Sequence, residues 1–189
     1  MKRGIAGFPL ERARGVRLLA LDVDGVLTAG HIFMDDDGRE TKAFNVRDGH
    51  GIKLLQRAGI EVAIITGRSS GVVARRAEDL GIQQVVQGCL NKMEGLQAVL
   101  EATGADADAC AFMGDDVLDI PPMRACRLGL APADAHPAAL THADWASDLP
   151  GGAGAVRQAA EGLILANDAW ARVIGERYGV SPADCGWSA

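Results

Sequence analysis

The chain has 189 residues, of which 48% are hydrophobic and 23% charged, with a formal net charge of −6. This length and composition predict one domain with its own hydrophobic core. The acidic balance argues against a nucleic acid or an anionic membrane as partner, because both select basic surfaces. A small anionic ligand, held by a few local cations, is compatible with it.

No stretch has the pattern of a targeting or membrane-spanning segment. The first apolar run, residues 16–21, stops at Asp22, and no later run approaches the roughly 18 residues that a bilayer requires. The four cysteines form no Cys-x-x-Cys pair and are expected to be reduced. We therefore expect a cytoplasmic protein.

Short apolar runs alternate with helical spacing along most of the chain. Runs rich in branched residues predict strands at 16–21, 61–65, 84–86, 109–113 and near 127–130. Apolar residues spaced at three and four predict helices at 51–58, 71–80, 93–102 and 117–126, the last interrupted by Pro121 and Pro122. This repetition predicts the α/β class, with a doubly wound, Rossmann-like parallel sheet.

Residues 27–46 do not follow that alternation. The strand-like segments 27–34 and 39–46 flank a turn that ends in Asp37-Gly38, a strong hairpin signal. This predicts an inserted β-hairpin.

The last third of the chain is expected to be irregular up to residue 154, with a short strand at 143–147. A long amphipathic helix is predicted at 155–177, followed by a loose tail. We therefore divide the chain into an N-terminal extension (1–15), one domain (16–178) and a C-terminal tail (179–189).

Carboxylates recur where the predicted strands end. Asp22 and Asp24 follow the first strand, and Asp115 follows the strand that ends at Met113. Because the carboxyl ends of parallel strands meet at one sheet edge, these carboxylates would repel one another unless a cation lay between them. Oxygen ligands favour a hard ion such as Mg²⁺, which keeps positions free for water and a substrate phosphate.

Two further strand ends add groups that bind phosphate. Thr66 offers a hydroxyl and Gly67 a backbone N–H, while Lys92 opens the next helix and adds a positive charge. Alone, Thr66 is equally typical of a helix cap, and Lys92 of a solvated helix lysine. Their joint order at successive strand ends favours phosphoryl transfer.

Four segments, DVDG at 22–25, ITGR at 65–68, NKMEG at 91–95 and GDDVLD at 114–119, resemble the motif set of the haloacid dehalogenase-like phosphatases. The resemblance implies that Asp22 is the nucleophile and that Asp24 is a general acid, then a general base. It implies Thr66 and Lys92 as phosphate binders. The metal would be held by Asp22, the backbone carbonyl of Asp24 and Asp115, and supported through its waters by Asp116 or Asp119.

A closer resemblance, from about residue 17 to 166, is to the members of this family that act on phosphorylated sugar acids. FNVRDG at 44–49, ADAHP at 133–137 and GGAGAVR at 151–157 carry it. It implies a homotetramer and a substrate site lined by Asn45, Val46, Arg47, Asp48, Gly49, Lys53, Arg68 and Arg76. An eight-carbon and a nine-carbon sugar acid are both compatible with this pattern.

Two other classes were considered. A receiver-type signalling domain has similar groups, but there the acidic pair comes first and the phospho-acceptor later, whereas Asp22 precedes the acidic pair here. A non-catalytic scaffold with the same fold would not need all of these acids, so their presence argues against that class.

The intervals between motifs leave no room for a separate cap domain, so the site is predicted to be open in one chain. The hairpin is expected to present Ile32, Met34, Ala43, Phe44 and Val46. Because an isolated hairpin is marginal in water, we expect hairpins from several chains to pair, with residues 45–49 beside a neighbour's Asp22.

Overall fold

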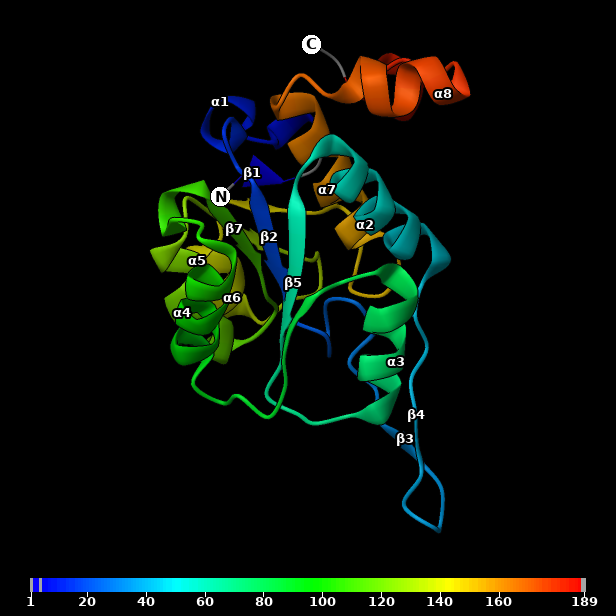
Figure 1. The fold of residues 1–189 in the computed structure, drawn as a ribbon, viewed down its shortest axis with the longest axis vertical. Helices are drawn as coiled ribbons and strands as arrows, with labels where there is room; N and C mark the ends of the chain where they lie inside the picture. The colour runs from blue at the N-terminus through cyan, green and yellow to red at the C-terminus, as the bar shows by residue number, and fades with distance from the viewer. Residues whose placement is uncertain (1, 4, 188–189) are drawn as a thin grey trace.

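A computed structural model describes residues 2–3 and 5–187 of the chain. Seven strands form one parallel sheet in the order β1-β9-β8-β7-β2-β5-β6 (Figure 1). The strands are β1 Lys2–Arg3, β2 Leu18–Leu21, β5 Glu61–Ile65, β6 Gln84–Val86, β7 Cys110–Met113, β8 Leu128–Ala131 and β9 Trp145–Ala146. The predicted doubly wound α/β sheet, with an inserted hairpin and no cap domain, is confirmed.

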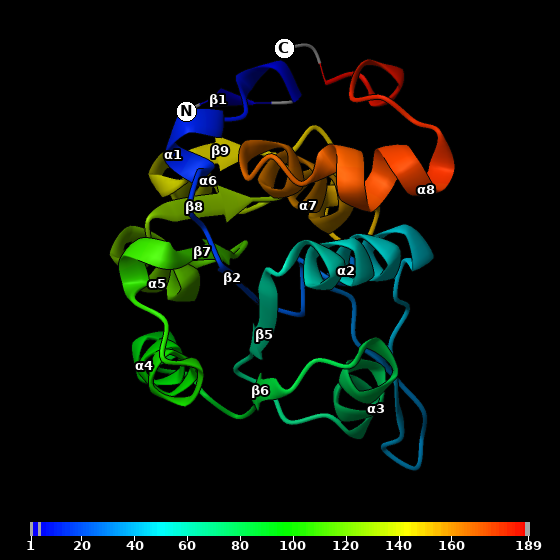
Figure 2. The same ribbon diagram turned by 45° about the horizontal axis from the view of Figure 1, so that its top comes forward.

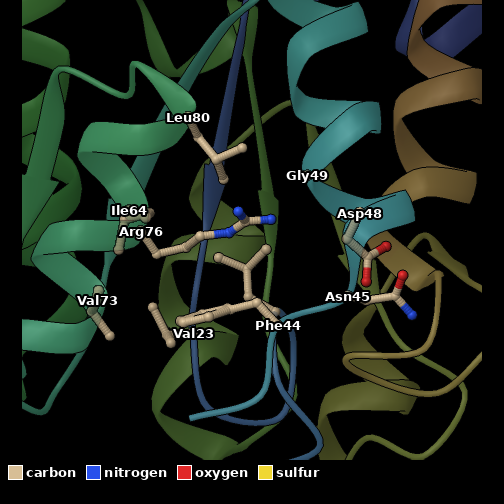
Figure 3. Close-up of a pocket in the computed structure, with 10 residues that line it drawn as sticks. Val23, Phe44, Asn45, Asp48, Gly49, Ile64, Val73, Arg76 and Leu80 are labelled. Carbon is tan, nitrogen blue, oxygen red and sulfur yellow. The ribbon is translucent and has the colours of Figure 1, made fainter. Parts of the chain in front are cut away.

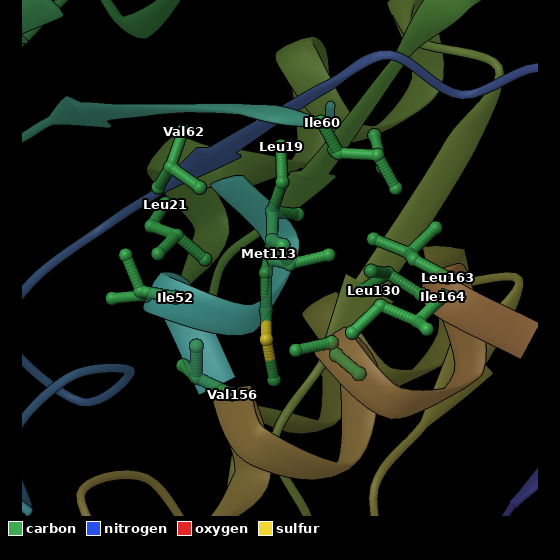
Figure 4. Close-up of a cluster of buried hydrophobic side chains, with 14 of the residues drawn as sticks. Leu19, Leu21, Ile52, Ile60, Val62, Met113, Leu130, Val156, Leu163 and Ile164 are labelled. Atoms are coloured by element: carbon green, nitrogen blue, oxygen red, sulfur yellow. The ribbon is translucent and has the colours of Figure 1, made fainter. Parts of the chain in front are cut away.

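Alternate residues of the central strand β2 face two separate helical layers. Leu19 and Leu21 belong to a core that includes residues of α2 (Val46–Ala58), α3 (Gly71–Leu80) and α7 (Ala155–Ala166) (Figure 4). Leu18 and Ala20 belong to a second core with residues of α4 (Lys92–Thr103), α5 (Ile120–Ala125) and α6 (Pro137–His142). A strand buried on both faces is uniformly apolar, which is why residues 18–21 show no alternation.

The hairpin strands are shorter than predicted, β3 Phe33–Met34 and β4 Glu40–Thr41. The predicted strand 39–46 is wrong at its end, because Asn45 caps α2 with a side-chain oxygen that accepts from the Arg47 N–H at 2.8 Å. Helix α2 therefore begins at Val46, not at residue 51. In Figure 1 the hairpin projects beyond the carboxyl ends of β2 and β5.

Two predicted helices are divided. The segment 117–126 is a 3₁₀ turn, Val117–Asp119, followed by α5, whose first turn accommodates two prolines that need no N–H partner there. The predicted helix 155–177 is also wrong as one element. It breaks after α7, where Asp168 takes a φ of 55°, and continues as a π-helical turn (Ala171–Gly175) and α8 (Glu176–Tyr178).

The C-terminal segment packs against the N-terminal one, so the prediction of a loose tail is wrong up to Trp187. The Trp187 ring is buried and meets the Phe8 ring edge-on at 5.6 Å. Its indole N–H donates to Glu161 Oε2 at 3.0 Å. Both ends lie at the edge of the sheet opposite the hairpin (Figures 1 and 2). No helix in the described part of the chain is long and apolar enough to cross a membrane.

Candidate active site

Three carboxylates converge where β2 and β7 end. Asp22, Asp115 and Asp119 each place an oxygen within 4.8 Å of the others. The β2–β7 ladder extends to Asp22, whose N–H donates to Met113 O at 3.0 Å, so the strand pairing itself positions this side chain. The predicted meeting of Asp22 and Asp115 at one sheet edge is confirmed.

Asp115 has an unsatisfied oxygen inside this cluster. Its Oδ1 is buried and has no hydrogen-bond partner among residues 2–3 and 5–187. A Cβ on Gly25 would lie 2.0 Å from Asp115 Oδ2, and Gly25 has a φ of 91°, so only glycine fits beside this carboxylate. A buried carboxylate oxygen without a partner is costly. A cation would satisfy it, and an all-oxygen donor set suits Mg²⁺.

Lys92 neutralises part of this acidic cluster. Its buried ammonium lies 2.9 Å from Asp22 Oδ2, 2.9 Å from Asp119 Oδ1 and 3.0 Å from the Ile65 carbonyl oxygen. Three acceptors account for the three N–H groups of the ammonium. Burial lowers the pKa of Lys92, but the charges of Asp22 and Asp119 outweigh it and raise the pKa above its ordinary value. Lys92 is therefore a fixed cation beside Asp22.

The acids bind protons more tightly than usual. Burial, and then the charge of Asp119, raise the pKa of Asp22 to about 6, against the opposing effect of Lys92. Burial, then Asp119, Asp22 and Asp116, raise the pKa of Asp115 to about 8. One lysine thus compensates only part of the negative charge, which again fits a site that holds a cation.

The two candidate supporting acids have different positions. Asp119 is buried, and its Oδ2 accepts from the N–H groups of Asp115 and Asp116 at 3.0 and 3.2 Å. Asp116 is exposed and caps the 3₁₀ turn by accepting from the Val117 N–H at 2.7 Å. Asp119 is therefore the residue that shapes the acidic cluster.

Thr66 and Gly67 offer donors at the next strand end. The Thr66 backbone continues the β5–β6 pairing, with its N–H donating to Val86 O at 2.9 Å. Within the described residues, neither the Thr66 hydroxyl nor the Gly67 N–H has a hydrogen-bond partner. Both are free to bind a phosphate oxygen.

Asp24 is held by a residue that the sequence did not indicate. The Lys42 ammonium contacts Asp24 Oδ1 and lies 3.2 Å from Glu40 Oε1, while Arg68 Nε lies 3.9 Å from Asp24 Oδ2. Lys42 follows a hairpin strand whose pattern gives no sign that this lysine is buried. Only the approach of the hairpin to the end of β2 reveals the pair.

Four of the residues expected at the substrate site line a pocket between α2 and α3: Asn45, Asp48, Gly49 and Arg76. Asn45 and Arg76 lie there with Phe44, and the Arg76 guanidinium carbon is 5.7 Å from the centre of the Phe44 ring (Figure 3). Gly49 admits this guanidinium, since a Cβ there would lie 2.4 Å from Arg76 Nη2. The expectation that the hairpin presents Phe44 is wrong, because this ring is half-buried against the core.

The charged groups of Asp48 and Lys53 are bound by the protein itself. Asp48 is buried, and its oxygens accept from the N–H groups of Gly154 (3.2 Å) and Arg157 (2.8 Å) at the start of α7. The Lys53 ammonium donates to Leu80 O at 2.6 Å, at the end of α3. Both join helices and contact none of the three clustered acids. Val46 and Arg47 are exposed on the first turn of α2.

Comparison with known proteins places the chain beside one group of phosphatases. Residues 49–127 match the haloacid dehalogenase-like hydrolase family. The 3-deoxy-D-manno-octulosonate 8-phosphate phosphatases of Salmonella typhi and Escherichia coli (strain K12) are each 45% identical over 157 residues, which is 83% of this chain and 84% of theirs.

Two solved structures of similar proteins share the fold. One is the 3-deoxy-D-manno-octulosonate 8-phosphate phosphatase of Yersinia pestis, 42% identical over 85% of this chain and 86% of that one, with a TM-score of 0.83. The other, from Moraxella catarrhalis, was solved in complex with magnesium ion, phosphate ion and a KDO molecule. It is 36% identical over 88% of this chain and 96% of that one, with a TM-score of 0.85.

Proposed function

Because the chain belongs to the haloacid dehalogenase-like phosphatases, we propose that it hydrolyses 3-deoxy-D-manno-octulosonate 8-phosphate through an aspartyl-phosphate on Asp22. The product would be the sugar acid Kdo, which is used for lipopolysaccharide biosynthesis. The cytoplasmic location stays a prediction. One observation carries the proposal most directly: Asp22 lies 2.9 Å from a buried ammonium and beside the unsatisfied oxygen of Asp115.

The chemistry follows from the groups around Asp22. Its carboxylate attacks phosphorus, the bond from phosphorus to the sugar oxygen breaks, and Asp24 gives that oxygen a proton. Asp24 then takes a proton from the water that attacks the aspartyl-phosphate, which releases phosphate and regenerates Asp22. Lys92, the Thr66 hydroxyl and the Gly67 N–H would hold the phosphate oxygens as charge develops on them.

A Mg²⁺ ion would be held by Asp22, Asp115 and the backbone carbonyl of Asp24, with Asp119 behind them. When bound, it would neutralise charge between the carboxylates and the phosphate. The unsatisfied Asp115 oxygen and the raised pKa values of Asp22 and Asp115 support this assignment.

The sugar-acid end of the substrate needs a cation away from the phosphate. Arg68 and Arg76 are the candidates near the hairpin and the α2–α3 pocket, and Asn45 lines that pocket beside Arg76. Guanidinium groups suit a carboxylate because they bind it through two parallel hydrogen bonds. Asp48 and Lys53 would then serve indirectly, by fixing the helices that carry these groups.

We also propose that the active enzyme is a homotetramer in which hairpins pair. Ile32, Phe33 and Met34 are 49%, 56% and 59% exposed, an apolar run that is costly to leave in water. Val46 and Arg47 lie at the base of the hairpin, where a neighbouring chain would meet them. Light scattering on the wild type and on Phe33→Asp tests this proposal, and a monomeric wild type would contradict it.

The substrate is tested by steady-state kinetics with Mg²⁺ on a panel of sugar phosphates. We expect kcat/KM to be highest for 3-deoxy-D-manno-octulosonate 8-phosphate. A higher value for a nine-carbon nonulosonate 9-phosphate would assign the chain to the sialate-type alternative. No phosphate release from any ester, in folded protein, would contradict the phosphatase mechanism itself.

A further inference from the structure

Lys42 is, with Lys92, one of two buried lysines near the proposed site. Its side chain is 0% exposed, although it directly follows β4 of a hairpin that otherwise projects into solvent. Burying an ammonium is unfavourable unless carboxylates pair with it. The carboxylates that pair with the Lys42 ammonium therefore fix its position, and the ammonium fixes theirs.

The partners of Lys42 form a chain of contacts that ends at Asp24. Lys42 contacts Asp24 Oδ1 and lies 3.2 Å from Glu40 Oε1. Glu40 is fixed in turn by the hydroxyl of Ser70, at the start of α3, and by Arg68 Nη2 at 3.5 Å. The Ser70 hydrogen bond, followed by Lys42 and Arg68, lowers the pKa of Glu40, so it stays ionised. The ammonium is thus anchored on its hairpin side.

We propose that Lys42 is a positioning residue that orients Asp24 for proton transfer to the leaving sugar oxygen. The proposal rests on the phosphatase mechanism above. A general acid acts only within hydrogen-bond reach of the atom that it protonates. Asp24 is 21% exposed and would otherwise rotate. Lys42 fixes its Oδ1 and leaves Oδ2, which is 3.9 Å from Arg68 Nε, as the freer oxygen.

A purely structural pair would have different consequences. If Lys42 only joined the hairpin to the sheet, its removal would weaken the protein and lower activity on every phosphate ester alike. If it orients Asp24, its removal matters most where the leaving group needs a proton. An alkoxide needs that proton, whereas a phenolate with electron-withdrawing groups leaves without one.

The experiment measures kcat/KM on alkyl and aryl phosphates, including a sugar phosphate and p-nitrophenyl phosphate, for Lys42→Met, Asp24→Asn and the double variant. The constant kcat/KM is used because it reports on steps up to departure of the leaving group. We expect Lys42→Met to lose about 10²-fold on alkyl esters and less than about 10-fold on p-nitrophenyl phosphate. The double variant should fall no further than Asp24→Asn alone.

Glu40→Gln is the matched control, because it removes the other partner of Lys42 and keeps the contact with Asp24. The ratio of kcat/KM between aryl and alkyl phosphates should stay close to the wild-type ratio in Glu40→Gln. Should Lys42→Met melt below the assay temperature, Lys42→Gln removes the ammonium but keeps a shorter polar side chain, and it should show the same dependence on the leaving group as Lys42→Met. An equal loss on all esters, or losses that multiply in the double variant, would overturn the role of Lys42. A wild type inactive on every ester would instead contradict the proposed function.

Discussion

Lys92 Nζ lies 2.9 Å from Asp22 Oδ2, and the same ammonium reaches Asp119 at 2.9 Å on its other side. One buried cation therefore pairs with a carboxylate that directly follows β2 and with another in the 3₁₀ turn after β7. The proposed nucleophile thus has its orientation set by a helix that begins 70 residues later in the chain. Because Lys92 contacts the proposed nucleophile and also neutralises buried acids, we expect it to affect both activity and stability.

Replacing Lys92 with Met should damage both properties. The buried acids lose their only described ammonium partner, and breaking a buried pair costs about 3–5 kcal/mol. Loss of one fixed charge beside the phosphate should lower kcat/KM by about 10²-fold or more. Urea unfolding and phosphate release measure the two effects, with Arg75→Met on the exposed face of α3 as control. Wild-type turnover in Lys92→Met would remove this lysine from the mechanism.

Asp22→Asn should give a folded but inactive protein. The amide is not a nucleophile, so phosphate release should fall to background even with excess Mg²⁺. Because burial and Asp119 raise the pKa of Asp22 to about 6, ionised Asp22 is unfavourable at pH 7.5. Metal-free Asp22→Asn should therefore melt at or above the wild-type temperature. Normal turnover by this variant would exclude the aspartyl-phosphate.

Magnesium should stabilise the protein more at high pH. The pKa of Asp115 is raised from 3.8 to about 8 in the folded chain, so the stability from its protonated form is complete below about pH 4 and is lost as the pH rises through 8. Metal-free Tm should fall from pH 6 to 8.5.

Bound Mg²⁺ displaces that proton and satisfies Asp115 Oδ1, so the increase in Tm on adding the ion should grow over the same range. At 100 times its Kd, a ligand adds about 2.7 kcal/mol. Differential scanning fluorimetry with and without EDTA measures both trends, and Asp115→Asn should abolish them. A Mg²⁺ effect of equal size at pH 6 and 8.5 would argue against Asp115 as a ligand.

The C-terminal segment should support the fold and leave catalysis unaffected. Trp187 is buried against Phe8 and hydrogen-bonded to Glu161, at the sheet edge opposite the acidic cluster. Removing a buried aromatic side chain costs about 3–5 kcal/mol, so Trp187→Ala should lower Tm clearly. Its kcat/KM, measured below the new Tm, should match wild type. Trp187→Phe, which keeps the ring contact, should lose less stability, and a selective loss of kcat would show instead that this segment acts at an active site.

The sequence alone was enough to predict the site for side chains whose position depends only on the order of strands. Parallel strands bring their carboxyl ends to one edge, so Asp22, Thr66 and Asp115 could be assigned to one site from the places where apolar runs stop. Strands 61–65 and 84–86 were also predicted with the bounds that the structure gives, because each contains a short run of branched apolar residues.

Only the tertiary structure decided what the long polar side chains do. Lys42, Asp48 and Lys53 lie within 12 positions of one another in the sequence, yet one contacts Asp24, one caps α7 and one binds the end of α3. The partners of a charged side chain are set by which segments fold against it, over separations such as the 109 positions between Asp48 and Arg157. The local sequence pattern does not predict such contacts. A charged side chain needs a partner because it becomes buried, and that burial arises only when the helices and the hairpin pack against the sheet.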